Sequence, residues 1–234
     1  MIPRANADSK GFTLIELLVV IAVIAILSSM ALPALSSGKG KAKQASCTSN
    51  MRQIGMGMLI YADEHDGWLP GTSHSTGTNA SWIFTLAPYV GNADRIRISP
   101  ADPNGELRIR SRGTSYVMNE WTSVDSRDPF GSLRETYRRL DTLKKPSETM
   151  TVFIISDSAG VGTTQDHTHS RNWHKGWNAV IADIQPDRHN TARPAADKSE
   201  GVSNYLYADG HVSSIRASTL KELIERGINF SRPP

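Results

Sequence analysis

The chain has 234 residues, which is enough for one globular domain together with an anchoring helix. Its formal net charge is only +3 and its charges are mixed in sign, so we expect no nucleic-acid partner. The single cysteine, Cys47, excludes an intrachain disulfide, so packing or a metal ion must hold the folded part together.

An acidic residue stands at the head of an apolar stretch near the N-terminus. Residues 1–10 are polar and carry Arg4 and Lys10, and the sequence Gly-Phe-Thr-Leu-Ile-Glu follows at residues 11–16. The apolar residues 14–35 make roughly 33 Å of helix, which just crosses the hydrocarbon core of a bilayer. Glu16 would cost about 2.5–3.5 kcal/mol in hydrocarbon without a partner, so it is a candidate functional residue.

An ordinary secretory signal peptide is the alternative interpretation of this region, since it too combines a charged start with an apolar run. That interpretation gives Glu16 no role. It also lacks a clean cleavage site between small residues, because Pro33 interrupts the sequence Ala31-Leu32-Pro33-Ala34.

The hexapeptide and its apolar tail resemble the cleavage and methylation site of type IV prepilins and type II secretion pseudopilins. The resemblance implies that a prepilin peptidase cuts between Gly11 and Phe12 and methylates the new amine of Phe12. It further implies that Glu16 neutralises the new amine of a neighbouring subunit during assembly. The implied partners are the prepilin peptidase, other pilin or pseudopilin subunits and membrane lipid.

The same resemblance implies a location. The leader would lie in the cytoplasm, the chain would cross the inner membrane once, and its bulk would be periplasmic or otherwise extracytoplasmic. The positive-inside rule does not decide the orientation, because Lys39, Lys41 and Lys43 follow the apolar stretch while the leader is also basic. These lysines are interpreted either as a solvated helix face or as a contact with lipid headgroups.

Helical periodicity resumes after Pro33. Residues 36–40 are weak helix formers, and a flexible joint is one interpretation of them. Apolar residues then recur on one helical face, which predicts core packing against a sheet; they are Cys47, Met51, Ile54, Met58 and Tyr61. We expect this helix to end near Ala62.

Beyond the helix, the pattern predicts a short apolar helical segment at residues 82–90 and strands at 114–119, 150–157 and 204–215. The last of these is a hairpin around Asp209-Gly210, and a short helix at 220–226 follows it. Residues 122–136, 158–178 and 187–201 are expected to be polar connections.

The expected fold is therefore α+β and pilin-like. A long N-terminal helix, half in the membrane and half soluble, packs on a small antiparallel sheet. The expected parts are a leader at residues 1–11, a transmembrane helix at 12–35, a soluble continuation of that helix at 36–66, and a globular domain at 67–234.

The later segments resemble a subgroup of pseudopilin-like proteins with a His…Asp-Gly-His-Val ending. The matching parts occur in the subgroup's order: Ser99-Pro100-Ala101-Asp102, Ser115-Tyr116-Val117-Met118-Asn119, Pro146-Ser147-Glu148-Thr149, Asp157, His189 and Asp209-Gly210-His211-Val212. Two features depart from the subgroup. Ser99 replaces its usual cysteine, and His189 lies 20 residues before Asp209, about twice the usual spacing. Whether His189 acts with the Asp-Gly turn is left open.

Residues 166–174 hold three histidines and one aspartate. His167 and His169 could ligate zinc together with His174 or Asp166, and Asp209 is a further weak candidate ligand. A metal site also needs hydrogen-bonded groups that fix its ligands, and a loop rich in serine and threonine offers few of them. An exposed loop is the preferred interpretation, and we assign no metal here.

Calcium is the weak cofactor candidate, because carboxylates near strand ends or turns can bind it; they are Asp157, Asp183, Asp187 and Asp209. A dense Asp-x-Asp-x-Asp sequence is missing, so we expect no cofactor. The chain contains no nucleophile elbow, phosphate-binding glycine loop or zinc-protease motif, and we expect it not to be an enzyme.

Two functions remain. The preferred one is a membrane-anchored pseudopilin or minor pilin, a structural subunit of a type II secretion pseudopilus or type IV pilus-like filament. The alternative is a membrane-anchored extracytoplasmic module that binds a ligand such as a polysaccharide. Glu16 distinguishes the two functions, because assembly needs its charge and a simple anchor does not.

Overall fold

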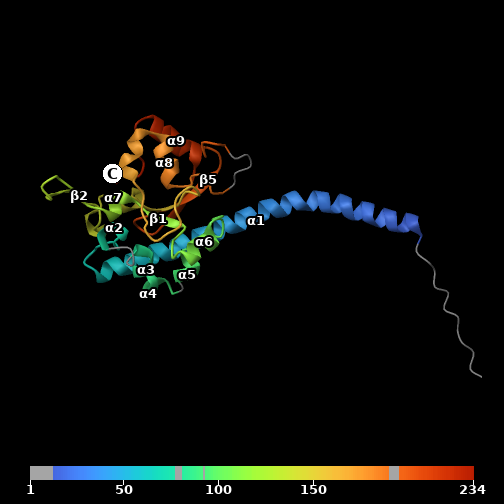
Figure 1. The fold of residues 1–234 in the computed structure, drawn as a ribbon, viewed down its shortest axis with the longest axis horizontal. Helices are drawn as coiled ribbons and strands as arrows, with labels where there is room; N and C mark the ends of the chain where they lie inside the picture. The colour runs from blue at the N-terminus through green and yellow to red at the C-terminus, as the bar shows by residue number, and fades with distance from the viewer. Residues whose placement is uncertain (1–12, 77–80, 92, 190–194) are drawn as a thin grey trace, which may run out of the picture. The chain divides into compact units, whose positions relative to one another are not determined.

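The computed structural model describes residues 13–76, 81–91, 93–189 and 195–234 (Figure 1). The leader, the cleavage-site residue Gly11 and Phe12 lie outside these described residues. The chain divides into two compact units, Met1–Lys39 and Gly40–Pro234.

The first helix, α1 (Leu14–Glu64), has 51 residues and contains Pro33. It remains helical through residues 36–40, where a joint was one interpretation, although the boundary between the two units falls at Lys39. Each glycine in this stretch costs about 1 kcal/mol relative to alanine. A helix that is already nucleated gains one hydrogen bond for each residue it adds, which compensates for two such residues.

An antiparallel sheet forms the centre of the second unit. Its four strands lie in the order β1 (Tyr116–Met118), β4 (Met150–Ile154), β5 (Val202–Tyr207) and β6 (Val212–Arg216). Each neighbouring pair is antiparallel. The three predicted strand regions and the final hairpin are confirmed, and Gly210 occupies the turn with a φ of +87°.

The sheet is covered on both faces, as Figure 1 shows for the second unit. Side chains alternate between the faces along each strand. Tyr116 and Met118 of β1 therefore pack with the soluble part of α1, while Val117 packs on the other face. That other face carries α8 (Trp177–Asp183) and α9 (Ala217–Glu225).

The predicted apolar face of α1 is confirmed as core. Cys47, Met51 and Ile54 are fully buried, Met58 is nearly so, and Tyr61 is partly buried against the same cluster. The helix also approaches the β5–β6 hairpin closely at Gly55. A Cβ atom there would stand 2.8 Å from Leu206 Cδ1 and 3.2 Å from the backbone Cα of Gly210.

Short helices and one small hairpin complete the described part of the chain. The helices are α2 (Ser73–Thr76), α3 (Trp82–Thr85), α4 (Ala87–Val90), α5 (Ala93–Ile96), α6 (Gly105–Arg110) and α7 (Glu120–Ser123). The hairpin joins β2 (Ser126–Arg127) to β3 (Leu133–Glu135). Single 3₁₀ turns or helices lie at Leu140–Thr142, Pro146–Glu148 and Ser170–Lys175.

Two of the expected polar connections were therefore wrong in part. Residues 122–136 contain the β2–β3 hairpin, and residues 158–178 contain a 3₁₀ helix and the start of α8. The second segment is ordered because two of its tryptophans enter the core: Trp173 is fully buried and Trp177 is 7% exposed. Large aromatic side chains bury enough area to order a polar segment.

Candidate functional site

The start of α1 is closed by a reciprocal cap. The Thr13 N–H and its Oγ1 hydroxyl both donate to Glu16 Oε2, at 2.9 and 2.8 Å. In return, the Glu16 N–H donates to Thr13 Oγ1 at 3.2 Å. This is a capping box, in which Ser or Thr before the helix and Glu in its third position satisfy each other's backbone N–H groups.

The cap leaves part of the Glu16 carboxylate available. Both bonds from Thr13 end on the same oxygen, Oε2. An ionised carboxylate offers about four lone-pair sites on its two oxygens. Glu16 can therefore hold the start of its own helix and still accept hydrogen bonds from a donor on another chain.

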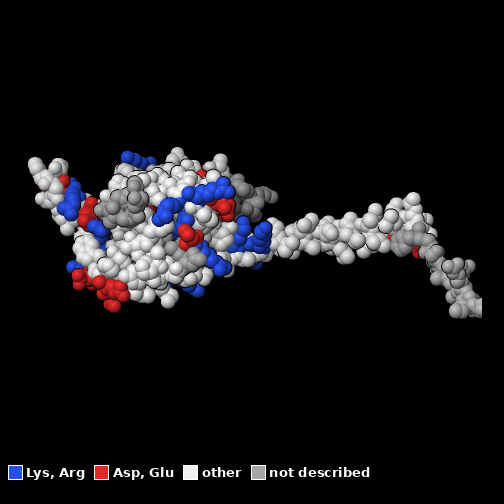
Figure 2. All heavy atoms as spheres, turned by 60° about the horizontal axis from the view of Figure 1, so that its bottom comes forward, with Lys and Arg blue, Asp and Glu red and all other residues white. Residues whose placement is uncertain are grey.

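An apolar surface follows the cap. The large side chains from Leu14 to Leu35 are exposed by 45–79%. In Figure 2 this stretch of α1 is nearly uncharged. So much exposed apolar area requires a partner or a membrane. Among the described residues, α1 is the one helix long and apolar enough to span a bilayer.

Cys47 lies on the buried face of α1 and is not a reactive thiol. Burial raises the pKa of this thiol. The Tyr116 hydroxyl donates to Cys47 Sγ at 3.6 Å, which fixes the sulfur against β1. A buried cysteine with a raised pKa behaves as a small apolar core residue.

The subgroup motifs hold the fold together instead of forming one site. Asp102 and Arg108 are an ion pair at 2.8 Å whose side chains are both fully buried. The Ser115 hydroxyl donates to the same Asp102 oxygen at 2.6 Å. Asn119 Nδ2 donates to the carbonyls of Met150 and Ser231. These motif residues therefore tie loops and the C-terminus to the sheet.

His189 and the Asp209-Gly210 turn lie at opposite ends of β5. The backbone of His189 pairs with Val202, at the start of the strand. Asp209 instead accepts from its own turn, where His211 contacts it at 2.6 Å. His189 and the Asp209-Gly210 turn are therefore separated by the length of β5, and His189 does not pair with Asp209.

The four calcium candidates have different partners. Asp157 pairs with Arg188 at 2.5 Å, and Asp187 accepts from Gln185 at 2.7 Å. Asp183 accepts hydrogen bonds from the histidine segment, and Asp209 from His211. Within the described residues, no three of these carboxylates converge on one point.

The histidine segment is rearranged relative to the sequence-based prediction. His174 Nδ1 lies 2.8 Å from the Arg171 carbonyl, and Asp209 is held in its own turn. His167 and His169 do come together, but the third histidine of their group is His74. The sequence-based prediction missed His74 because it lies 93 residues before His167.

Two family models match parts of this chain. A family model described as the prokaryotic N-terminal methylation motif matches residues 6–32, and a family described as a protein of unknown function (DUF1559) matches residues 36–97. The type II secretion system core protein G of Escherichia coli is 32% identical over 106 residues, which cover 44% of this chain and 71% of that protein. The chain belongs to the type IV pilin and pseudopilin family.

Other relatives agree with this assignment. The type IV major pilin protein PilA of Myxococcus xanthus is 26% identical over 163 residues, covering 70% of this chain and 67% of that pilin. The type IV major fimbrial protein FimA of Dichelobacter nodosus is 33% identical over 101 residues, covering 41% of this chain and 62% of FimA. The chain thus spans less than two thirds of FimA. No solved structure matches it.

Family membership confirms the preferred interpretation of the N-terminus over an ordinary signal peptide. The pilin-like chain is a structural filament subunit with one membrane-anchoring span, a prepilin-type N-terminal methylation motif and the α+β fold expected from the sequence. The relatives named above are pilin, fimbrial or secretion-system proteins, and none of their names is that of an enzyme.

Proposed function

We propose that this chain is a pseudopilin or minor pilin that a prepilin peptidase cuts after Gly11 and methylates at Phe12. Residues 12–35 then hold it in the inner membrane and pack against other subunits in the filament. The bulk of the chain lies on the periplasmic side, and it acts as a structural part, without catalysis. The observation that supports this proposal best is the capped Glu16 carboxylate at the head of an exposed apolar helix.

Cleavage creates the partner that Glu16 needs. The new amine would be on Phe12, next to the helix cap at Thr13. An amine and a carboxylate in a low-dielectric environment each cost several kcal/mol when alone, and they neutralise each other when paired. In a bundle of such helices, the carboxylate of one subunit meets the amine of the next. Both charges are then satisfied in the assembled state.

The lysines after the apolar stretch suit the membrane surface. Lys39, Lys41 and Lys43 follow Leu35 within two helical turns or so. Each basic residue near an anionic lipid surface contributes about 1 kcal/mol. We propose that they contact lipid headgroups before the subunit enters the filament.

The capping box allows the charge of Glu16 to be tested separately from its cap. Glu16→Gln keeps the cap, because glutamine also completes a capping box, but removes the charge. Thr13→Ala keeps the charge and weakens the cap, at a cost of about 1 kcal/mol. Both variants should enter the membrane. If the charge drives assembly, Glu16→Gln will lose subunit cross-links and Thr13→Ala will largely retain them.

The experiment requires co-expression with the native assembly machinery and chemical cross-linking of neighbouring subunits in intact cells. Membrane fractionation verifies that each variant is inserted. Cross-linked filament from Glu16→Gln at the wild-type level would reject the assembly role of the charge and favour the plain anchor. Loss of assembly in Thr13→Ala alone would assign Glu16 to helix capping instead.

A further inference from the structure

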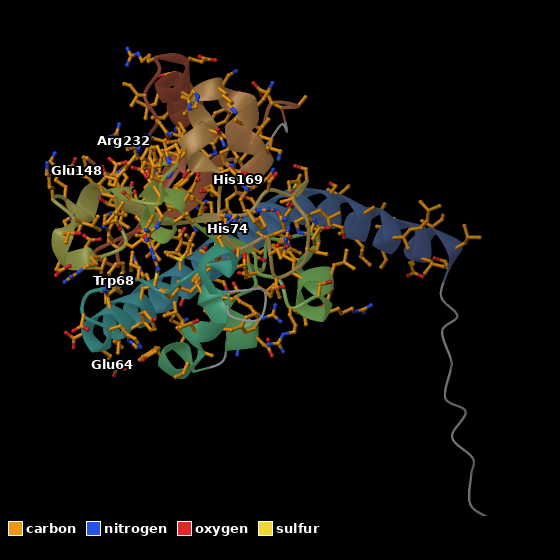
Figure 3. All side chains as sticks on the ribbon, turned by 60° about the vertical axis from the view of Figure 1, so that its left-hand side comes forward. Glu64, Trp68, His74, Glu148, His169 and Arg232 are labelled. Carbon is orange, nitrogen blue, oxygen red and sulfur yellow. The ribbon has the colours of Figure 1, made fainter. Side chains whose placement is uncertain are left out.

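Three histidine side chains from distant parts of the chain meet at one surface of the second unit. His74 lies in α2, and His167 and His169 lie in the segment before the 3₁₀ helix at Ser170–Lys175. One potential ligand atom from each lies within 4.8 Å of the others. The His74 and His167 ring centroids are 4.4 Å apart, and those of His167 and His169 are 5.4 Å apart. Figure 3 labels His74 and His169, which come from separate segments.

Carboxylates orient two of the three rings. His167 Nδ1 lies 2.9 Å from Asp166 Oδ1, and His169 Nδ1 lies 3.3 Å from Asp183 Oδ1. An ionised carboxylate only accepts hydrogen bonds, so each Nδ1 carries the proton. In the neutral ring the lone pair is then on Nε2, which is the arrangement of metal-binding histidines held by a carboxylate.

The segment that carries His167 is anchored to the sheet. The Met118 N–H donates to the Asp166 carbonyl, and the Thr168 N–H donates to the Met118 carbonyl, at 2.9 and 2.8 Å. The indole of Trp82 donates to the same Asp166 carbonyl at 2.8 Å. A serine- and threonine-rich loop was expected to offer few groups that fix metal ligands, and this expectation is wrong, because a β-bridge to β1 fixes the segment.

One buried carboxylate links the two halves of the cluster. Asp166 is fully buried, and its Oδ2 accepts from the Ser73 N–H while its Oδ1 accepts from the Ser73 hydroxyl. Ser73 directly precedes His74. The carboxylate that orients the His167 ring thus also fixes the backbone beside His74.

The second carboxylate is fixed in the same way. Asp183 Oδ2 accepts from the backbone N–H of His169 and from the indole of Trp173, both at 2.8 Å. Because Trp173 is fully buried, Asp183 is held between the core and the histidine cluster. Both oriented rings therefore have outer partners that are themselves hydrogen-bonded.

We propose that His74, His167 and His169 bind a divalent transition-metal ion of the zinc class. Imidazole nitrogen suits zinc, and three histidines with one water complete its tetrahedral coordination. Zn–N bonds of about 2.0–2.1 Å place two such nitrogens roughly 3.4 Å apart. The exposed His74 and His169 side chains can close this distance by rotating, while the buried His167 side chain remains fixed. The ion joins α2 to the segment that carries His167.

The proposal is tested with the untagged full-length chain in detergent micelles, after treatment with a chelator. Zn²⁺ is titrated calorimetrically into the wild type and into His74→Ala and His169→Ala, whose side chains are exposed. The matched control is His174→Ala, in the same part of the chain, because its ring lies against the Arg171 carbonyl. Far-ultraviolet circular dichroism verifies that every variant remains folded.

We expect one Zn²⁺ per wild-type chain and the same affinity for His174→Ala. His74→Ala and His169→Ala should each bind at least about 100-fold more weakly, since even the loss of an outer partner costs 10–100-fold. Co²⁺ in place of Zn²⁺ should give the intense visible bands of tetrahedral coordination in the wild type alone. Absence of stoichiometric binding, or equal affinity in His74→Ala and the wild type, would overturn the proposal.

Discussion

At the scale of single residues, His189 links stability to pH. The residue is 4% exposed, and its backbone pairs with Val202 at the start of β5. Burial, followed by the charges of Arg188 and Lys43, lowers the pKa of His189 from 6.5 to about 4. The folded chain therefore holds this ring neutral at pH 7, whereas the unfolded chain protonates it near pH 6.5.

The sign of the pH effect follows from these two pKa values. Above about pH 7 the ring is neutral in both states and pH has no effect through it. As the pH falls from about 6.5 to about 4, the unfolded state gains a proton that the folded state refuses. The free energy of unfolding then falls by up to about 1.4 kcal/mol per pH unit.

This prediction is checked by urea denaturation in metal-free buffer at about pH 7.5 and about pH 5. The wild type and the exposed control His174→Gln should lose stability between the two conditions. His189→Gln should lose clearly less, whatever its stability at the higher pH. A His189→Gln protein with the same pH dependence as the wild type would show that another group carries the effect.

Some residue-scale contacts could be found in the sequence and others could not. The capping box was available, since Thr13-Leu14-Ile15-Glu16 matches the Ser/Thr-x-x-Glu signature before an apolar run. The role of Glu16 in its own helix was nevertheless missed. The His74–His167 contact had no local signal, because it depends on how the chain between them folds back.

At the scale of elements, the soluble half of α1 offers a matched pair of sites. Ile54 is fully buried on the sheet, while Met56, two residues further on, is 62% exposed. Ile54→Asp places an unpaired charge in the core and should lower the free energy of unfolding by several kcal/mol. Met56→Asp should change it by less than about 0.5 kcal/mol.

Tryptophan fluorescence during chemical denaturation measures both variants, because the five tryptophans of the chain all lie after residue 40. Equal unfolding midpoints for Ile54→Asp and its parent would mean that α1 does not pack on the sheet. A large fall in the free energy of unfolding of Met56→Asp would mean that the opposite face of the helix packs on the sheet.

The elements that the sequence predicted best are those with strong apolar patterns. The α1 face and strand β4 carry periodic or continuous apolar residues, and both are buried as expected. The β2–β3 hairpin was missed because its five residues are half-exposed or exposed, so burial imposes no alternation on them. In the second helical layer, α9 was expected from the sequence, whereas α8 was missed because its order depends on Trp173 and Trp177.

At the scale of the whole molecule, the chain divides after Lys39. The unit from Gly40 to Pro234 contains the sheet, both core clusters and the soluble part of α1. A fragment of residues 40–234 should therefore be soluble and unfold cooperatively, with nearly the same midpoint as the domain in the full chain. Aggregation, or a broad transition without cooperativity, would show that the apolar half of α1 is needed for folding.

The proposed function depends above all on cleavage that makes Phe12 the N-terminus. Mass spectrometry of the chain isolated from membranes that contain a prepilin peptidase tests it most directly. The N-terminal peptide should begin at Phe12 and carry one added methyl group. An intact leader beginning at Met1, or an N-terminus near Ala34 as a signal peptidase would leave, would contradict processing as a prepilin and with it the pairing of Glu16 with a new amine.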